Sequence, residues 1–213
     1  METFFYLFQD IAFLPLQVLL VTIIINELLK KREKKTLLSK MNMVVGAYYS
    51  EVGNELLQIF SKFDKRIRKI NEQFLTDSRW ARKFVAEFRQ VIRNCDYSID
   101  LDQGNLLELR DFLRSQRAFI VTLLQNGNLL EHESFTDMLW AVTHLAEELS
   151  FRQSCHQLSE DDKKHLTGDV RRAYMYSLNE WISYMVHLKD DYPYIFSLYL
   201  RTNPFDKQAK VEF

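Results

Sequence analysis

The sequence predicts an all-α protein, in which an N-terminal transmembrane helix continues into a cytoplasmic bundle of about five helices. The 213 residues include only five glycines and three prolines, about 4% of positions against an average near 12%. The tight turns of β sandwiches and barrels depend on these two residues. Apolar residues, 47% of the chain, recur every three or four positions, which is the period of one helix face.

Residues 1–29 form the predicted membrane anchor. Residues 11–25, IAFLPLQVLLVTIII, carry no charge, and about 20 apolar residues are enough for a helix to cross a bilayer. Pro15 is tolerated in such a helix but kinks it. The alternative is a helix that is buried in a soluble core or lies in the membrane interface, because Gln9, Asp10 and Gln17 dilute the apolar pattern.

A basic block follows the apolar run directly. It consists of Lys30, Lys31, Arg32, Lys34 and Lys35. The positive-inside rule places such a block on the cytoplasmic side, where it contacts the anionic headgroups of the bilayer. The sequence therefore predicts a single-pass protein of the inner membrane, with the N-terminus outside and the C-terminal domain in the cytoplasm.

Residues 30–76 are predicted to form one long amphipathic helix, because apolar residues recur at helical spacing from Leu38 to Phe74. Gly46 and Gly53 lie on one face of it, which allows another helix to approach closely. That helix belongs either to the same chain or to a second copy. The pattern also fits a coiled coil, and a homo-oligomer is the alternative to packing within one chain.

Residues 77–203 are predicted to complete the bundle, and residues 204–213 to form a flexible tail. The helices are expected at about 78–94, 105–126, 133–152 and 159–188, with a short last helix at 194–201. Ser159, followed by Glu160, Asp161 and Asp162, is typical of a helix N-terminus. Gly127 suits the position after the end of the preceding helix.

The charges divide unevenly along the chain. Residues 30–95 hold 16 Lys and Arg against 7 Asp and Glu, whereas residues 96–213 hold 12 against 19. The basic half either pairs with the acidic half or contacts lipid, and we expect lipid contact for residues 30–40. Nucleic acid is not an expected partner, because the net charge is −1 and a basic stretch alone is not specific.

One segment, residues 133–149, gathers groups that could act in catalysis or metal binding. Glu133, Asp137, His144 and Glu148 fall on one face of a helix, and carboxylates and imidazoles are ligands for zinc or iron. The doubled Glu-x-x-His pattern of helical di-metal proteins is missing. A solvated polar face is therefore the favoured interpretation, and no catalytic residue, metal or cofactor is predicted.

The C-terminal third is rich in aromatic residues, which makes it the candidate surface for an unknown protein partner. The expected members are Tyr184, Tyr192, Tyr194 and Tyr199. Tyrosine and tryptophan are enriched at protein interfaces. Packing of these rings in the core and at its rim is the favoured interpretation, and the partner surface is the alternative.

Residues 129–149 and the segment YPYIFSLYLRTNPFD at 192–206 resemble an uncharacterised family of small bacterial membrane proteins. The resemblance extends from the apolar N-terminus to the NPF near the end of the chain. It implies a bacterial inner-membrane protein with a cytoplasmic helical domain. It assigns no catalytic residue.

The favoured function is non-enzymatic: a membrane-tethered interaction or regulatory module at the inner leaflet. A first alternative is an accessory subunit of a transporter or channel, which would use Asp10, Gln17 and Asn26 as contacts between helices. A second is a membrane-bound metal-dependent enzyme that uses the acidic and histidine residues of 133–148. Cys95 and Cys155 are predicted to be free thiols.

Overall fold

The computed structural model describes residues 2–64, 80, 85–86, 90, 99–127, 129, 132–152, 155 and 158–205, and side chains for these residues except 2–12 and 38. The elements are α1 (Glu2–Tyr48), the π-helical turn η1 (Tyr49–Gly53), α2 (Asn54–Ser61), α5 (Leu106–Leu124), α6 (Glu133–Phe151), α7 (Glu160–Asp191) and α8 (Pro193–Arg201). The described residues contain no β-strand, and their β-type pairing is an isolated antiparallel bridge between Asp64 and Ile99. The predicted all-α fold is confirmed.

The chain divides into two compact units, Met1–Met43 and Val44–Phe213. The first unit is helical throughout its described length, and Pro15 lies inside the helix. Its large apolar side chains between residues 13 and 29 are 49% to 61% exposed. By length and composition alone, one helix in the described residues is long and apolar enough to cross a membrane.

The helical run ends at Ser61, so the prediction that it continues to about residue 76 is wrong. Lys62 and Phe63 form a turn, and the Asp100 amide donates a hydrogen bond of 3.0 Å to the Phe63 carbonyl. The Phe63 side chain is fully buried and packs against Gly104. Burial of this ring and its backbone hydrogen bond direct the chain out of the helix. Residues 65–76 lie outside the described residues.

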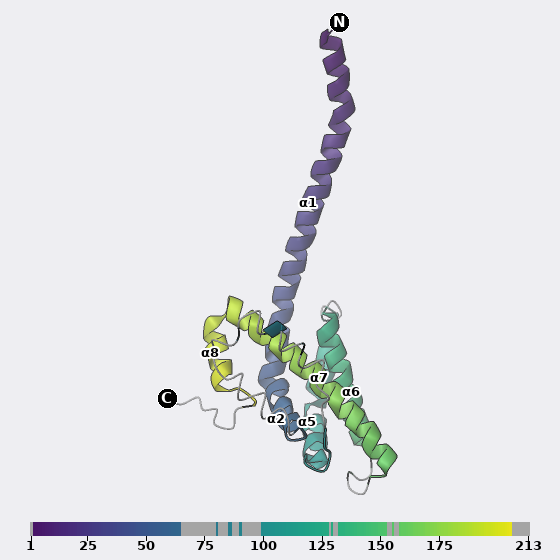
Figure 1. Ribbon diagram of the computed structural model, residues 1–213, viewed down its shortest axis with the longest axis vertical. Coiled ribbons are helices and arrows are strands. Elements are labelled where there is room, and N and C mark those ends of the chain that lie inside the picture. Colours follow the sequence, from purple (N-terminus) through teal and green to yellow (C-terminus); the bar gives the residue numbers. More distant parts are fainter. Residues whose placement is uncertain are drawn as a thin grey trace. The chain divides into compact units, whose positions relative to one another are not determined.

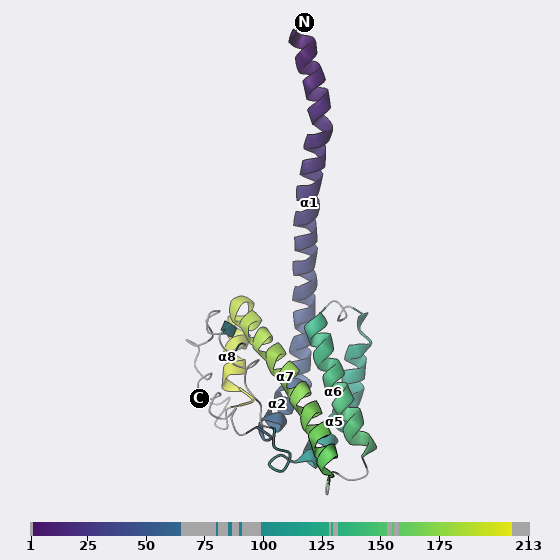
Figure 2. The ribbon, with the colours of Figure 1, turned by 45° about the vertical axis from the view of Figure 1, so that its right-hand side comes forward.

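The second unit is built around α7, which packs against α6, α8, α2 and η1, while α6 also packs against α5. Figures 1 and 2 both show α6 beside α7 and α5 beside α6. The α6–α7 pair provides the site described below. The helix predicted at 78–94 lies largely outside the described residues. Of the tail predicted at 204–213, residues 204 and 205 are described: Pro204 is buried and the Phe205 ring packs against Trp181 at 5.3 Å, so the prediction of a flexible tail is wrong for these two residues.

Aromatic side chains fill the centre of this unit. Tyr49 stacks on Tyr184 with ring centroids 5.6 Å apart, and its hydroxyl donates a 2.8 Å hydrogen bond to the Ser177 carbonyl. A Cβ atom at Gly46 would lie 2.7 Å from the Tyr184 hydroxyl oxygen. The close approach predicted at Gly46 therefore occurs between segments of the same chain.

Side chains cap the first turns of α5 and α7, and the cap at Ser159 was predicted. The Asn105 side chain accepts hydrogen bonds from the amides of Leu107 and Glu108 at the start of α5. Ser159 accepts one from the Asp162 amide at the start of α7. The expectation for Gly127 is wrong, because α5 ends at Leu124 with Gln125 as its cap.

Candidate functional site

Four potential metal ligands come together between α6 and α7. His144 and Glu148 lie on α6, and His165 and Asp169 lie on α7. One nitrogen or carboxylate oxygen from each residue lies within 4.8 Å of those of the other three. In each helix the two residues are four positions apart, which places them on the same face. We call these four residues the His-carboxylate cluster.

Each histidine of the cluster faces a carboxylate of the other helix. The Nε2 atom of His165 lies 3.1 Å from Oε1 of Glu148, and that of His144 lies 3.5 Å from Oδ2 of Asp169. His165 Nε2 is also 3.3 Å from Asp169 Oδ2 in its own helix. His144, the earlier of the two residues in α6, faces Asp169, the later of the two in α7, and Glu148 faces His165. This order is expected for two antiparallel helices.

Two arginines hold the outer oxygens of the carboxylates. Arg172 Nη1 donates to Asp169 Oδ1 at 3.1 Å, and Arg152 Nη2 lies 3.7 Å from Glu148 Oε2. The other oxygen of each carboxylate faces the histidines. Arg152 also donates to Asp162 Oδ1 at 2.8 Å. This bond, together with one from Ser159, lowers the pKa of Asp162 below its ordinary value.

The cluster is buried on one side and open on the other. The Asp169 side chain is 3% exposed, whereas those of His144 and His165 are 50% and 55% exposed. Within the described part of the chain, Asp169 Oδ2 has no hydrogen-bond partner, although two imidazole nitrogens lie within 3.5 Å of it. The site therefore combines a buried acceptor with solvent access.

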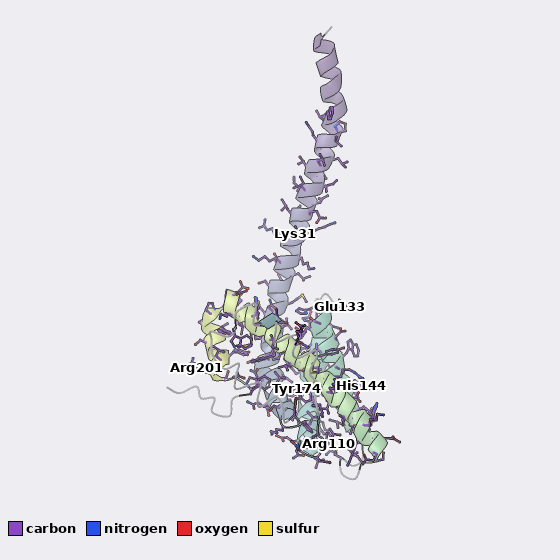
Figure 3. All side chains as sticks on the ribbon, in the orientation of Figure 1. Lys31, Arg110, Glu133, His144, Tyr174 and Arg201 are labelled. Carbon is purple, nitrogen blue, oxygen red and sulfur yellow. The ribbon has the colours of Figure 1, made fainter. Side chains whose placement is uncertain are left out.

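The predicted polar face of residues 133–148 is only partly present in the cluster. His144 and Glu148 belong to it, but Glu133 and Asp137 do not. Figure 3 shows Glu133 near the start of α6 and His144 further along the helix. His165 and Asp169 were missed. Their spacing repeats that of His144 and Glu148, and this repeat was the available signal in the sequence.

The predicted partner surface needs correction at two tyrosines. Tyr184 and Tyr199 are buried, with exposed fractions of 7% and 8%, and their rings pack edge to face at 5.5 Å. The cause is that α8 folds back onto α7. Burial raises the pKa of both hydroxyls above the ordinary value. Tyr192 is half-buried against His187, and Tyr194 is 73% exposed.

The basic block lies on α1 with its side chains exposed. Within the described residues, its one ion pair joins Lys30 Nζ to Glu27 Oε1 at 4.0 Å. Figure 3 labels Lys31, which extends from the helix. These cations are therefore available to an anionic surface.

A cationic pocket lies beside the cluster, and Arg152 lines this pocket and also contacts the cluster. It is lined by Arg110, Arg114 and Arg117 of α5 with Ser150 and Arg152, and Arg152 contacts the cluster residue Glu148. Guanidinium groups favour carboxylates and phosphates. An anion held here would lie next to the cluster.

The sequence matches two family models. The model described as "Uncharacterized protein MJ1433, C-terminal helical domain" matches residues 37–201, which is most of the chain. The model described as "MJ1433, N-terminal helical domain" matches residues 1–29. The chain belongs to the MJ1433 family. The basic block lies between the two matched segments of this MJ1433-family protein.

A relative of the chain is the "Uncharacterized protein MJ1433" of Methanocaldococcus jannaschii. The two sequences are 41% identical over 204 residues, which cover 96% of this chain and 82% of that protein. This relative is archaeal, so it gives no support to the bacterial source that the sequence resemblance implied. No solved structure matches the chain.

Proposed function

We propose that this MJ1433-family protein is a single-pass membrane protein that holds its helical domain at the cytoplasmic face of the cell membrane. The domain acts there as a non-enzymatic interaction or regulatory module. The observation that carries the proposal is an apolar helix that nothing in the described residues covers. The basic block follows it immediately.

The exposure of this helix favours a membrane over a protein core. A core helix of a soluble protein has its apolar side chains buried, whereas no residue of the most apolar window of this helix is buried. One polar side chain of the segment, that of Thr22, makes its hydrogen bond within the helix. The Thr22 hydroxyl donates to the Val18 carbonyl at 2.7 Å, which lowers the cost of placing a hydroxyl in hydrocarbon.

The basic block supports the proposed orientation. Each Lys or Arg close to an anionic leaflet contributes about 1 kcal/mol. Five such residues within six positions would hold the start of the cytoplasmic segment at the lipid surface. Positive charge next to a membrane span also retains that end of the chain on the cytoplasmic side during insertion.

The most exposed part of the predicted partner surface is on α8. Tyr194 and Leu198 are four positions apart on this helix and are 73% and 39% exposed. Residues at this spacing share a helix face, and exposed aromatic and aliphatic groups are common at interfaces. We assign the contact with a protein partner to this face in place of the buried Tyr184 and Tyr199.

The membrane proposal is tested by alkaline carbonate extraction of membranes from cells that express the full-length chain. We expect the wild-type chain to stay in the membrane pellet at full length. Leu20→Lys with Ile24→Lys should release the chain, because each charge in the centre of a span costs about 2.5–3.5 kcal/mol.

Met43→Lys is the matched control, because Met43 lies on the same helix and is 74% exposed but falls beyond the basic block. This variant should stay in the pellet. The proposal fails if the wild-type chain appears in the carbonate supernatant. It also fails if the chain is shortened by removal of the apolar segment, as a signal sequence would be.

A further inference from the structure

We propose that the His-carboxylate cluster binds a divalent transition-metal ion, with Zn²⁺ as the best match. The four ligands would be His144 and Glu148 from α6 and His165 and Asp169 from α7. This proposal does not depend on the membrane proposal, because all four residues lie in the second unit.

The donor set is appropriate for this class of ion. Two imidazole nitrogens and two carboxylate oxygens suit Zn²⁺, which takes four such ligands in a tetrahedron. Mg²⁺ and Ca²⁺ prefer oxygen ligands alone, and imidazole shifts the preference toward zinc and its neighbours in the first transition row.

The distances fit a tetrahedral ion. With metal–ligand bonds of about 2.1 Å, neighbouring ligand atoms lie about 3.4 Å apart. The three contacts that involve Glu148 or Asp169 and a histidine measure 3.1, 3.3 and 3.5 Å. The widest separation in the cluster is within 4.8 Å.

The arginines orient the carboxylates as outer partners do in metal sites. Arg172 binds Asp169 Oδ1, which leaves Oδ2 to face both histidines. Arg152 lies against Glu148 Oε2, which leaves Oε1 to face His165. Hydrogen bonds and ion pairs of this kind fix the direction in which a ligand presents its free lone pair.

Asp169 supplies an independent sign of a ligand. Its Oδ2 atom is buried and has no hydrogen-bond partner in the described residues. A buried carboxylate oxygen that accepts no hydrogen bond is costly, and the two imidazole nitrogens that face it lie at 3.3 and 3.5 Å. A cation held between the two histidines and this oxygen would satisfy it.

A simple ion pair elsewhere on α7 differs from the arrangement in the cluster. His187 Nδ1 lies 2.8 Å from Asp191 Oδ2, at the same spacing of four positions. That pair consists of a single histidine and a single carboxylate, and it has the length of an ordinary hydrogen bond. In the cluster, two histidines converge on one buried oxygen at longer distances, which is the arrangement expected around an ion.

The proposal is tested by titrating the full-length, tag-free protein in mild detergent, after chelator treatment and dialysis, with Zn²⁺ by calorimetry. Co²⁺ is added in parallel and its visible absorption is recorded. We expect one ion per chain and the strong visible bands of four-coordinate Co²⁺. His165→Gln and Asp169→Asn should each weaken Zn²⁺ binding by about 100-fold or more, since loss of an outer partner alone costs 10–100-fold.

The matched control is His187→Gln, which removes a histidine from the same helix outside the cluster and should leave the affinity unchanged. Circular dichroism checks that each variant is folded. If Asp169→Asn does not fold, His144→Gln replaces it, because the His144 side chain is half exposed. The proposal is overturned if the folded wild-type protein binds neither Zn²⁺ nor Co²⁺ stoichiometrically. It is equally overturned if His187→Gln weakens binding as much as the cluster variants do.

Discussion

Replacing Phe135 with alanine should lower the free energy of unfolding by about 3–5 kcal/mol, the range for a buried aromatic side chain. Phe135 is fully buried in the first turn of α6, and its ring packs edge to face against Tyr48 at 5.5 Å. Truncation removes this contact and leaves a cavity in the aromatic core. Chemical denaturation of the full-length chain in detergent, followed by circular dichroism, measures the change.

Phe151→Ala is the matched control at the other end of the same helix. Phe151 is 84% exposed, so we expect a change within about 0.5 kcal/mol. Equal destabilisation by the two substitutions would mean that the core is not where the structure places it.

Gly53→Ala should destabilise the protein by about 1–3 kcal/mol, the usual cost of overpacking a core. The backbone of Gly53 is helical, with φ −64° and ψ −37°, so alanine by itself would favour the helix by about 1 kcal/mol. The added Cβ, however, would meet the Tyr49 ring and would lie 2.8 Å from the Tyr48 ring. Both rings are fully buried and have little room to move. We therefore expect the steric cost to exceed the helix preference.

Gly168→Ala separates these two effects, because Gly168 lies within α7 and nothing lies within 4 Å of a Cβ added there. This substitution should raise the free energy of unfolding by about 0.5–1 kcal/mol. Thermal melts of the two variants beside the wild type measure both changes. A stabilising Gly53→Ala would contradict the packing of the two tyrosines.

The parts of the fold that depend on local sequence could be predicted. The spacing of apolar residues indicated α5, α6 and α7 to within a few residues, and the capping side chain of Ser159 marked the start of α7. The end of the first helical run could not be predicted, because it depends on a contact between distant segments. Phe63 continues the helical pattern in the sequence, but its carbonyl accepts a hydrogen bond from Asp100.

The candidate site was also predictable only in the part that depends on local sequence. The sequence placed His144 and Glu148 on one face of a helix. It did not determine which residues of another helix pack against that face. His165 and Asp169 come into position only because α6 and α7 are antiparallel neighbours. In the same way, the fold-back of α8 buries Tyr199 against Tyr184, and periodicity alone could not distinguish these rings from the exposed Tyr194.

The central claim is that a spanning helix holds the helical domain on the cytoplasmic side, and thiol labelling of intact cells tests it most directly. In a chain that carries Cys95→Ser and Cys155→Ser, a new cysteine is placed at Thr3 or at Gly168. A membrane-impermeant maleimide should label Thr3→Cys in intact cells and Gly168→Cys only after the membrane is permeabilised. Labelling of Gly168→Cys in intact cells, or of neither position until the cells are broken, would contradict the proposed topology.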